Sequence, residues 1–229
     1  MFLDGYGPAI LDGAWVTLRL ALLSLCLAFA AGLAGAAAKL SGTRILVWPA
    51  TAYSTLFRGV PDLVMMLIVF YGGQVMVNQV TDALEWDYVD LSPFIAGVLT
   101  IGVIFGAYFT ETFRGAFLAV PAGQMEAGRA YGMTSLQVFM RILFPQMLRH
   151  ALPGIGNNWL VLVKSTAIVS MIGLADMNFV ADQAGRTTHQ PFLFYMVVCL
   201  LYLCVTSVSS WTLHRLERRY SVGVRHAEF

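Results

Sequence analysis

Residues 20–38 read LALLSLCLAFAAGLAGAAA and contain no charged side chain. Three further stretches share this property: residues 63–81, 91–110 and 190–213. Each is long enough to cross the hydrocarbon core of a bilayer as a helix, which takes about 20 residues. A fifth, weaker stretch covers residues 149–175, where Lys164 interrupts the apolar run and Pro153 disturbs its start. The sequence therefore predicts an all-α integral membrane protein with five transmembrane helices.

The overall composition agrees with a membrane-embedded chain. Apolar residues make up 58% of the 229 residues and charged residues 12%, whereas soluble domains average about 25% charged residues. The net charge of +1 gives no electrostatic case for nucleic acid as a partner. The first span is too long for a cleavable secretion signal, so we expect it to be retained. The three cysteines lie inside apolar spans, where we expect neither a metal site nor a disulfide.

The charges between the spans indicate how the chain crosses the membrane. The segment after span one carries Lys39, Arg44 and Arg58, whereas the segment after span two (residues 82–90) carries four acids and no base. Arginine again predominates after span three and in the tail, which includes Arg225. Because Lys and Arg concentrate in cytoplasmic loops, we predict an N-terminus outside and a C-terminus in the cytoplasm. No internal repeat or linker is visible, so we expect one domain over residues 1–229.

The loop between spans three and four carries the most informative motif. Residues 120–134 read VPAGQMEAGRAYGMT. Pro121 stops one helix, the residues from Glu126 onward favour a short second helix, and Gly132 can end it in a left-handed conformation. Thr134 or Ser135 can cap the helix that follows. The pattern predicts helix, sharp turn and helix on the cytoplasmic face, and on physical grounds alone a re-entrant or interfacial amphipathic loop is the alternative.

The spacing of this motif resembles the EAA loop of ABC importer permeases. The matching positions are Glu126, Ala127, Gly132, Ile142 and Pro145. Gly128 stands where a second Ala is common, and Phe144 where Leu is common, but neither change disturbs the spacing. The resemblance implies that residues 120–145 form a coupling helix that docks into a groove on a cytoplasmic ATPase. It assigns that role to Glu126, Ala127, Gly132 and Thr134.

Further blocks of sequence narrow the resemblance to one branch of the permease family. FRGVP at 57–61, ETFRG at 111–115 and LVKST at 162–166 resemble the permeases of importers for polar amino acids. RGVPDLV at 58–64, GAYFTET at 106–112, LPGIGNNW at 152–159 and LERRYSVGV at 216–224 resemble the Q-type branch of that family. This branch serves histidine, lysine, arginine and ornithine importers. Octopine and nopaline permeases are near relatives and remain an alternative.

The resemblance implies a set of partners. They are a homologous M-type permease, two ATPase subunits that bind ATP and Mg, a periplasmic amino-acid-binding protein, and the bilayer of a bacterial inner membrane. The sequence contains no phosphate-binding loop of the G-x-x-x-x-G-K-[ST] type, so we expect ATP to be handled by another chain and no cofactor in this one. We also find no nucleophile or metal-ligand motif and expect no catalytic activity.

Three ionisable residues are candidates for the transport pathway, because a charge within the membrane is costly unless it is paired or hydrated. Asp62 either caps a helix or pairs with Arg58, or it faces the pathway and favours cationic side chains. Glu111 either pairs with Arg114 within one helix or faces the pathway. Lys164 either contacts an acidic neighbour or attracts a substrate carboxylate.

Polar side chains in the fourth span are a second set of candidates. Asn157 and Asn158 are followed by Ser165, Thr166 and Ser170. These residues either form hydrogen bonds between helices or line the pathway. Two other classes of protein remain as rivals, an ion-driven secondary transporter or channel subunit and an intramembrane enzyme. A secondary transporter or channel subunit requires no docking loop. An intramembrane enzyme requires a nucleophile or a set of metal ligands, which we do not find.

Overall fold

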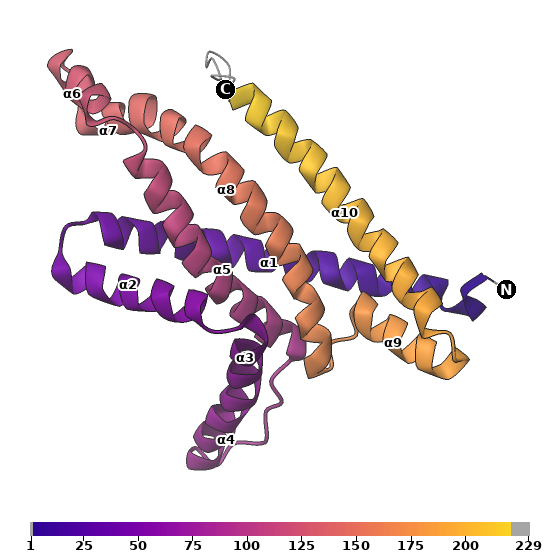
Figure 1. Cartoon of the computed structure of the whole chain (residues 1–229). Coiled ribbons are helices and arrows are strands. Elements are labelled where there is room, and N and C mark those ends of the chain that lie inside the picture. The colour runs from indigo at the N-terminus through magenta and orange to yellow at the C-terminus, as the bar shows by residue number, and fades with distance from the viewer. Residues whose placement is uncertain (1, 221–229) are drawn as a thin grey trace.

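The computed structural model describes residues 2–220, and Figure 1 shows an elongated, helical chain. A short 3₁₀ turn (Phe2–Gly5) precedes the first helix. The α-helices are α1 (Gly7–Leu40), α2 (Arg44–Gly59), α3 (Asp62–Leu67), α4 (Gly73–Ala83), α5 (Pro93–Leu118), α6 (Ala122–Ala130), α7 (Ser135–Val138), α8 (Phe144–Ser165), α9 (Met177–Thr188) and α10 (Pro191–Tyr220). Wider π-turns join α3 to α4 (Ile68–Gly72) and α7 to α8 (Phe139–Leu143), and a 3₁₀ segment (Thr166–Ile172) extends α8.

The described residues confirm the predicted all-α architecture. Within residues 2–220, five helices are long and apolar enough to cross a membrane: Gly7–Leu40, Asp62–Ala83, Pro93–Leu118, Ser135–Ile172 and Pro191–Tyr220. The weakest predicted span is the fourth, and it proves to be the longest, because α7, α8 and the turns beside them form one nearly continuous rod.

The core of the molecule is built around α5. Its side chains Phe105, Phe109 and Phe113 are buried, and the last two pack against Phe29 of α1. Small residues allow the two backbones to come close: a Cβ atom on Gly32 would lie 2.4 Å from the Cβ atom of Phe109. The small residues therefore permit close helix packing at this crossing.

Two segments between the predicted spans are helical. The segment after span one folds as α2, which packs against α1 and α5, and the Tyr53 hydroxyl donates a hydrogen bond to the Val103 carbonyl at 2.5 Å. Burial raises the pKa of Tyr53 to about 12. The segment after span four contains α9, whose first turn is capped by the Asp176 carboxylate through the Phe179 amide at 2.9 Å. A short N-cap motif without a long apolar run explains why composition did not reveal this helix.

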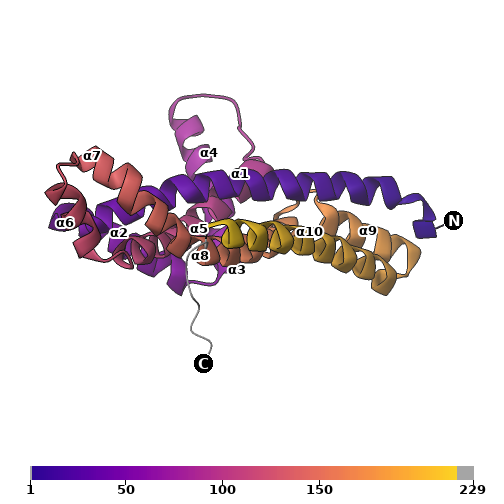
Figure 2. The same ribbon diagram turned by 90° about the horizontal axis from the view of Figure 1, so that it is seen from above.

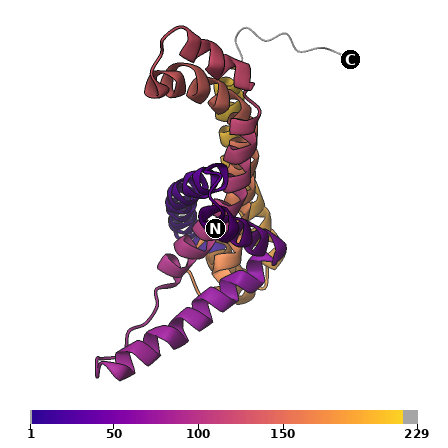
Figure 3. The same cartoon turned by 90° about the vertical axis from the view of Figure 1, so that its left-hand side faces the viewer.

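The two ends of the molecule carry different elements. The N-terminus and α9 lie at one end, and α6 and α7 lie at the other (Figures 1 and 2). The helix α10 runs from the α9 end back toward the end that carries α6, while α3 and α4 project away from the main body (Figures 1 and 3). Arg225 and Glu228 of the predicted cytoplasmic tail, and the last four residues of the 216–224 block, lie outside the described residues.

Candidate functional site

The segment 120–145 adopts the predicted helix, turn and helix. Pro121 precedes the first residue of α6, and Gly132 has a φ of +78°, a left-handed conformation that favours glycine. The Met133 amide donates to the Gly128 carbonyl at 3.1 Å, which closes the end of the helix. Thr134 then caps α7 in a reciprocal arrangement with Gln137. The helix starts at Ala122, four residues before the predicted start at Glu126.

The first departure from the EAA pattern has a structural reason. Gly128 is buried on the inner face of α6, and a Cβ atom there would lie 2.5 Å from Cδ1 of Ile142. The missing side chain lets α6 lie directly against the start of the following rod. At the second departure, the Phe144 ring packs against Phe139 with centroids 6.2 Å apart.

The outer surface of this segment is open. The side chains of Glu126, Ala127 and Thr134 are exposed, and Tyr131 has 87% of its surface accessible. Leu136 is 71% accessible. An exposed aromatic and an exposed leucine on a rigid turn form a surface suited to a protein partner, while the coupling role itself stays a prediction.

Two helix breaks meet beside Asp62, one at the start of the second span and one within the fourth. Val60 and Pro61 are extended, so the chain breaks between α2 and α3, and Asp62 is the first residue of α3. The rod of α8 changes to 3₁₀ geometry directly after Ser165, whose hydroxyl lies 3.4 Å from Oδ2 of Asp62. Membrane transporters use such discontinuous helices to place polar groups around substrates.

One interpretation of Asp62 was wrong. Its carboxylate neither caps α3 by a hydrogen bond nor, within residues 2–220, forms an ion pair with Arg58. The extended backbone at Pro61 interrupts the helix, so the four-residue spacing does not bring the two side chains together. The Arg58 guanidinium instead lies 5.5 Å from the centre of the Tyr108 ring.

Glu111 occupies a different environment. The predicted contact with Arg114 exists, with Nε 2.9 Å from Oε2. The other carboxylate oxygen pairs with Lys39 at the end of α1, and Lys39 also donates to the Ser54 hydroxyl of α2 at 2.6 Å. Three helices therefore converge on Glu111. Lys39 is predicted only as a charge between spans, and no local pattern signals its contact with Glu111.

The remaining polar candidates do not gather at one point. Asn158 is buried and donates to the Thr112 hydroxyl at 3.0 Å, which confirms a hydrogen bond between spans four and three. Asn157 is exposed and faces a groove between α8 and α10. Lys164 is exposed, and it takes part in none of the ion pairs found within residues 2–220. The pathway roles of these residues stay predictions.

A buried polar network at the α9 end was not foreseen. Asn178 donates to Oδ2 of Asp176 at 3.1 Å and to the Tyr202 hydroxyl at 2.9 Å. Burial raises the pKa of Asp176, although the hydrogen bonds that it accepts act in the opposite direction. Asp176 and Asn178 are neighbours in the sequence, but only the contact between α9 and α10 adds Tyr202, so no local motif signals the complete network.

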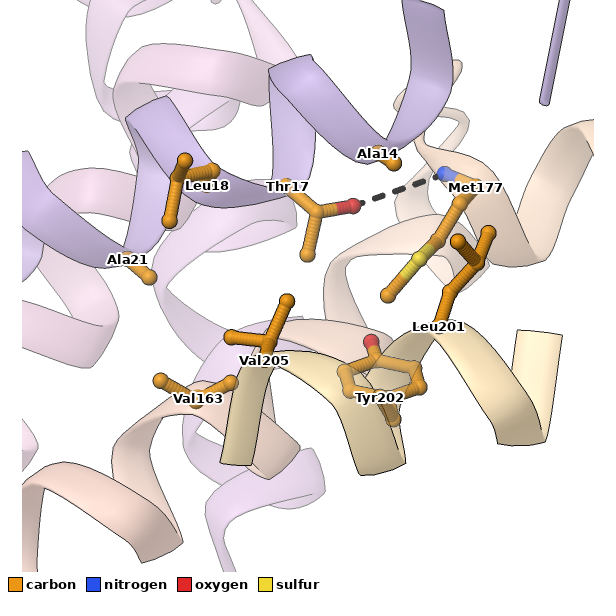
Figure 4. Close-up of a pocket in the computed structure, with 9 residues that line it drawn as sticks. All are labelled: Ala14, Thr17, Leu18, Ala21, Val163, Met177, Leu201, Tyr202 and Val205. Carbon is orange, nitrogen blue, oxygen red and sulfur yellow. Dashed lines mark hydrogen bonds between the residues drawn. The ribbon is translucent and has the colours of Figure 1, made fainter. Parts of the chain in front are cut away.

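Beside this network lies a small apolar cavity between α1, α8, α9 and α10 (Figure 4). Thr17 accepts a hydrogen bond from the Met177 amide at 3.4 Å at its edge. The cavity has a volume of about 50 Å³ and is lined mainly by aliphatic side chains such as Val163, Leu201 and Val205. This volume is on the scale of one or two water molecules, so the cavity is too small and too apolar to hold an amino acid.

Comparison with known proteins identifies the family. Residues 21–222 match the family described as binding-protein-dependent transport system inner membrane component. The chain is 55% identical over 226 residues to the histidine/lysine/arginine/ornithine transport system permease protein HisQ of Salmonella typhimurium, with 99% of each chain covered. It is 54% identical to the HisQ protein of Escherichia coli K12, again with 99% of each chain covered.

More distant matches extend the comparison. The octopine transport system permease protein OccQ of Agrobacterium tumefaciens is 39% identical, over 97% of this chain and 94% of that protein. A crystal structure of an amino acid ABC transporter with histidines matches with a TM-score of 0.80 and 31% identity, over 93% of this chain and 95% of that one. The chain therefore belongs to the family of binding-protein-dependent transport system inner membrane components, and it is a permease subunit of an ABC importer.

Proposed function

We propose that this permease imports the basic amino acids histidine, lysine, arginine and ornithine across a bacterial inner membrane. The observation that carries this proposal is the 55% identity to HisQ, which extends over 99% of both chains. The match to the octopine permease is lower, at 39%. Basic amino acids therefore rank ahead of opines as the substrate class.

In this proposal, α6 docks on one of two cytoplasmic ATPase subunits that bind ATP and Mg. The exposed surface of α6 and the fixed turn at Gly132 support this role. The segment is joined directly to α5 on one side and to the α8 rod on the other. Closure of the ATP-bound ATPase pair would thus pull on two spans at once and open the pathway outward, and hydrolysis would reset it inward.

We further propose that the N-terminus and α9 face the periplasm, where a binding protein delivers the amino acid, and that the C-terminus is cytoplasmic. The separation of α9 from α6 along the molecule supports this orientation (Figure 2). Reporter fusions should score outside at Asp87 and inside after Phe229. The same score at both positions would rule out this orientation.

The pathway itself is proposed to pass the two helix breaks. The half-buried Asp62 carboxylate favours the cationic side chain of a substrate, because its interaction with a cation is stronger at the edge of a low-dielectric region than in bulk water. Lys164, one residue before Ser165, favours the substrate carboxylate. A homologous M-type permease would complete the pathway from the opposite side.

The proposal is tested by reconstituting the assembled complex, with its co-purifying subunits and binding protein, in proteoliposomes. We expect labelled arginine to accumulate when ATP is present on the face that carries α6, and we expect excess lysine or histidine to compete better than octopine. Accumulation driven by an ion gradient without ATP would contradict ABC-type import. Stronger competition by octopine would identify opines, and not basic amino acids, as the substrate class.

A further inference from the structure

A groove between α8 and α10 is separate from both the coupling segment and the helix breaks. It has a volume of about 210 Å³. Its lining consists of Pro153, Gly156, Asn157 and Leu160 from α8 and Ser210, Leu213, His214 and Glu217 from α10. The two helices lie side by side (Figure 1), and a Cβ atom on Gly156 would lie 3.3 Å from Leu213. The groove thus has an apolar floor and polar walls.

Basic side chains lie at one end of this groove. Arg149 and His150 precede Pro153 by one helical turn on α8, and Arg218 follows His214 by one turn on α10. His150 and Arg218 are exposed, and Arg149 is half-buried. The ion pairs found within residues 2–220 involve none of these three side chains. This end of the groove therefore carries positive charge.

An aromatic residue indicates the depth of the groove in the bilayer. Trp211 follows the lining residue Ser210 and is 57% accessible, and the Arg215 guanidinium lies 3.7 Å from the centre of its ring. Tryptophan and arginine near the end of a span favour the headgroup region of a bilayer. The groove therefore lies where a span meets the phospholipid headgroups.

We propose that this groove binds the headgroup of an anionic phospholipid of the phosphatidylglycerol type. The phosphate is placed at the basic end, beside Arg149, His150 and Arg218. Basic pockets between transmembrane helices bind anionic headgroups by this charge complementarity. Leu160 and Leu213 contact the upper part of the acyl chains.

The polar walls account for the choice of headgroup. Glu217 disfavours a bare phosphate group, but its carboxylate accepts hydrogen bonds from hydroxyl groups. Asn157 and Ser210 supply further hydrogen-bonding groups. A headgroup that combines a phosphodiester with free hydroxyls fits both the basic end and these walls.

Fluorescence quenching tests the proposal on the full chain, purified with its co-purifying subunits and placed in phosphatidylcholine vesicles. Brominated phosphatidylglycerol is added in rising proportion, and bromine quenches nearby tryptophan. The Trp211 signal is the difference between each protein and the same protein carrying Trp211→Phe. We expect the proportion needed for half-maximal quenching of Trp211 to rise about fivefold in Arg149→Gln and in Arg218→Gln, since one basic contact near the membrane surface is lost.

The matched control is Arg44→Gln, which removes an exposed basic charge at the start of α2, away from the groove. Its half-maximal proportion should equal that of the parent. The proposal fails if neither Arg149→Gln nor Arg218→Gln changes this proportion, or if Arg44→Gln changes it equally. It also fails if brominated phosphatidylglycerol and brominated phosphatidylcholine both leave Trp211 unquenched, because a protein subunit would then cover the groove.

Discussion

Glu111 and Asp62 are both acidic residues within transmembrane helices, yet their surroundings differ. Both carboxylate oxygens of Glu111 are occupied, one by Lys39 and the other by Arg114. Asp62 has one long contact, at 3.4 Å from the Ser165 hydroxyl, and lies at a break between helices. The paired acid joins three helices, whereas the other retains the capacity to attract a cation. The role of an acidic residue in a span therefore depends on its partners and not on its depth alone.

The largest effect should come from removing the partner of Glu111. Lys39→Met keeps the length of the side chain but leaves one oxygen of a partly buried carboxylate without its cation. We expect the free energy of unfolding to fall by about 2 kcal/mol, less than for a fully buried ion pair, because both side chains keep some contact with solvent. Thermal unfolding of the purified complex in detergent measures this loss.

The matched control is Arg186→Gln. Arg186 pairs with Asp182 at 2.8 Å, but its side chain is 80% accessible, so its loss should cost about 0.5 kcal/mol or less. Equal losses in the two variants would show that the cluster around Glu111 is no more important to stability than an ordinary surface ion pair.

A second comparison concerns substrate choice. We expect Asp62→Asn to lower the ratio of arginine uptake to uptake of a neutral amino acid by about tenfold, because the loss of a nearby carboxylate costs a cation about 1.4 kcal/mol. Glu111→Gln should leave this ratio unchanged in whatever protein still assembles. If both variants keep the parental uptake ratio, the substrate is selected by the partner permease or by the binding protein.

Asp176 is a third acidic residue, which is fully buried and caps α9. Its substitution should have the smallest effect of the three. Its raised pKa means that the folded protein keeps the proton to higher pH than the unfolded chain does. The free energy of unfolding therefore falls as pH rises from the ordinary value of 3.8 through the raised one. Asp176→Asn retains a good cap and removes this dependence.

We expect the stability of Asp176→Asn relative to the parent to improve as pH rises from about 4 to about 7. Paired thermal unfolding curves of the two proteins at both pH values measure the change. A relative stability that worsens as pH rises would mean that the ionised carboxylate is stabilised in the folded state.

The sequence predicted the 120–145 segment well because its determinants are local. A left-handed glycine and a threonine cap act through the backbone within a few residues, so Gly132 and Thr134 were recognisable without a structure. Five spans followed from the absence of charge in long stretches. The EAA spacing and the adjoining blocks also led to the correct family.

Contacts between helices that are far apart in the sequence could not be predicted from local patterns. Lys39 lies 72 residues from Glu111, and no local pattern joins them. The predicted pairing of Asp62 with Arg58 was wrong. A local signal argued against it, because Pro61 disfavours a helical conformation at the residue before it. Asp62 and Ser165 are 103 residues apart, so only the three-dimensional structure shows that they lie together.

We propose that α6 transmits the ATPase cycle to the spans through the turn at Gly132. The most direct test is arginine-stimulated ATP hydrolysis by the reconstituted complex with Gly132→Val or Gly132→Asn. A β-branched residue in this left-handed conformation costs on the order of 1 to 2 kcal/mol, whereas asparagine tolerates it. We predict that valine abolishes the stimulation while the complex remains assembled, and that asparagine preserves most of it. Parental stimulation with valine would contradict the account.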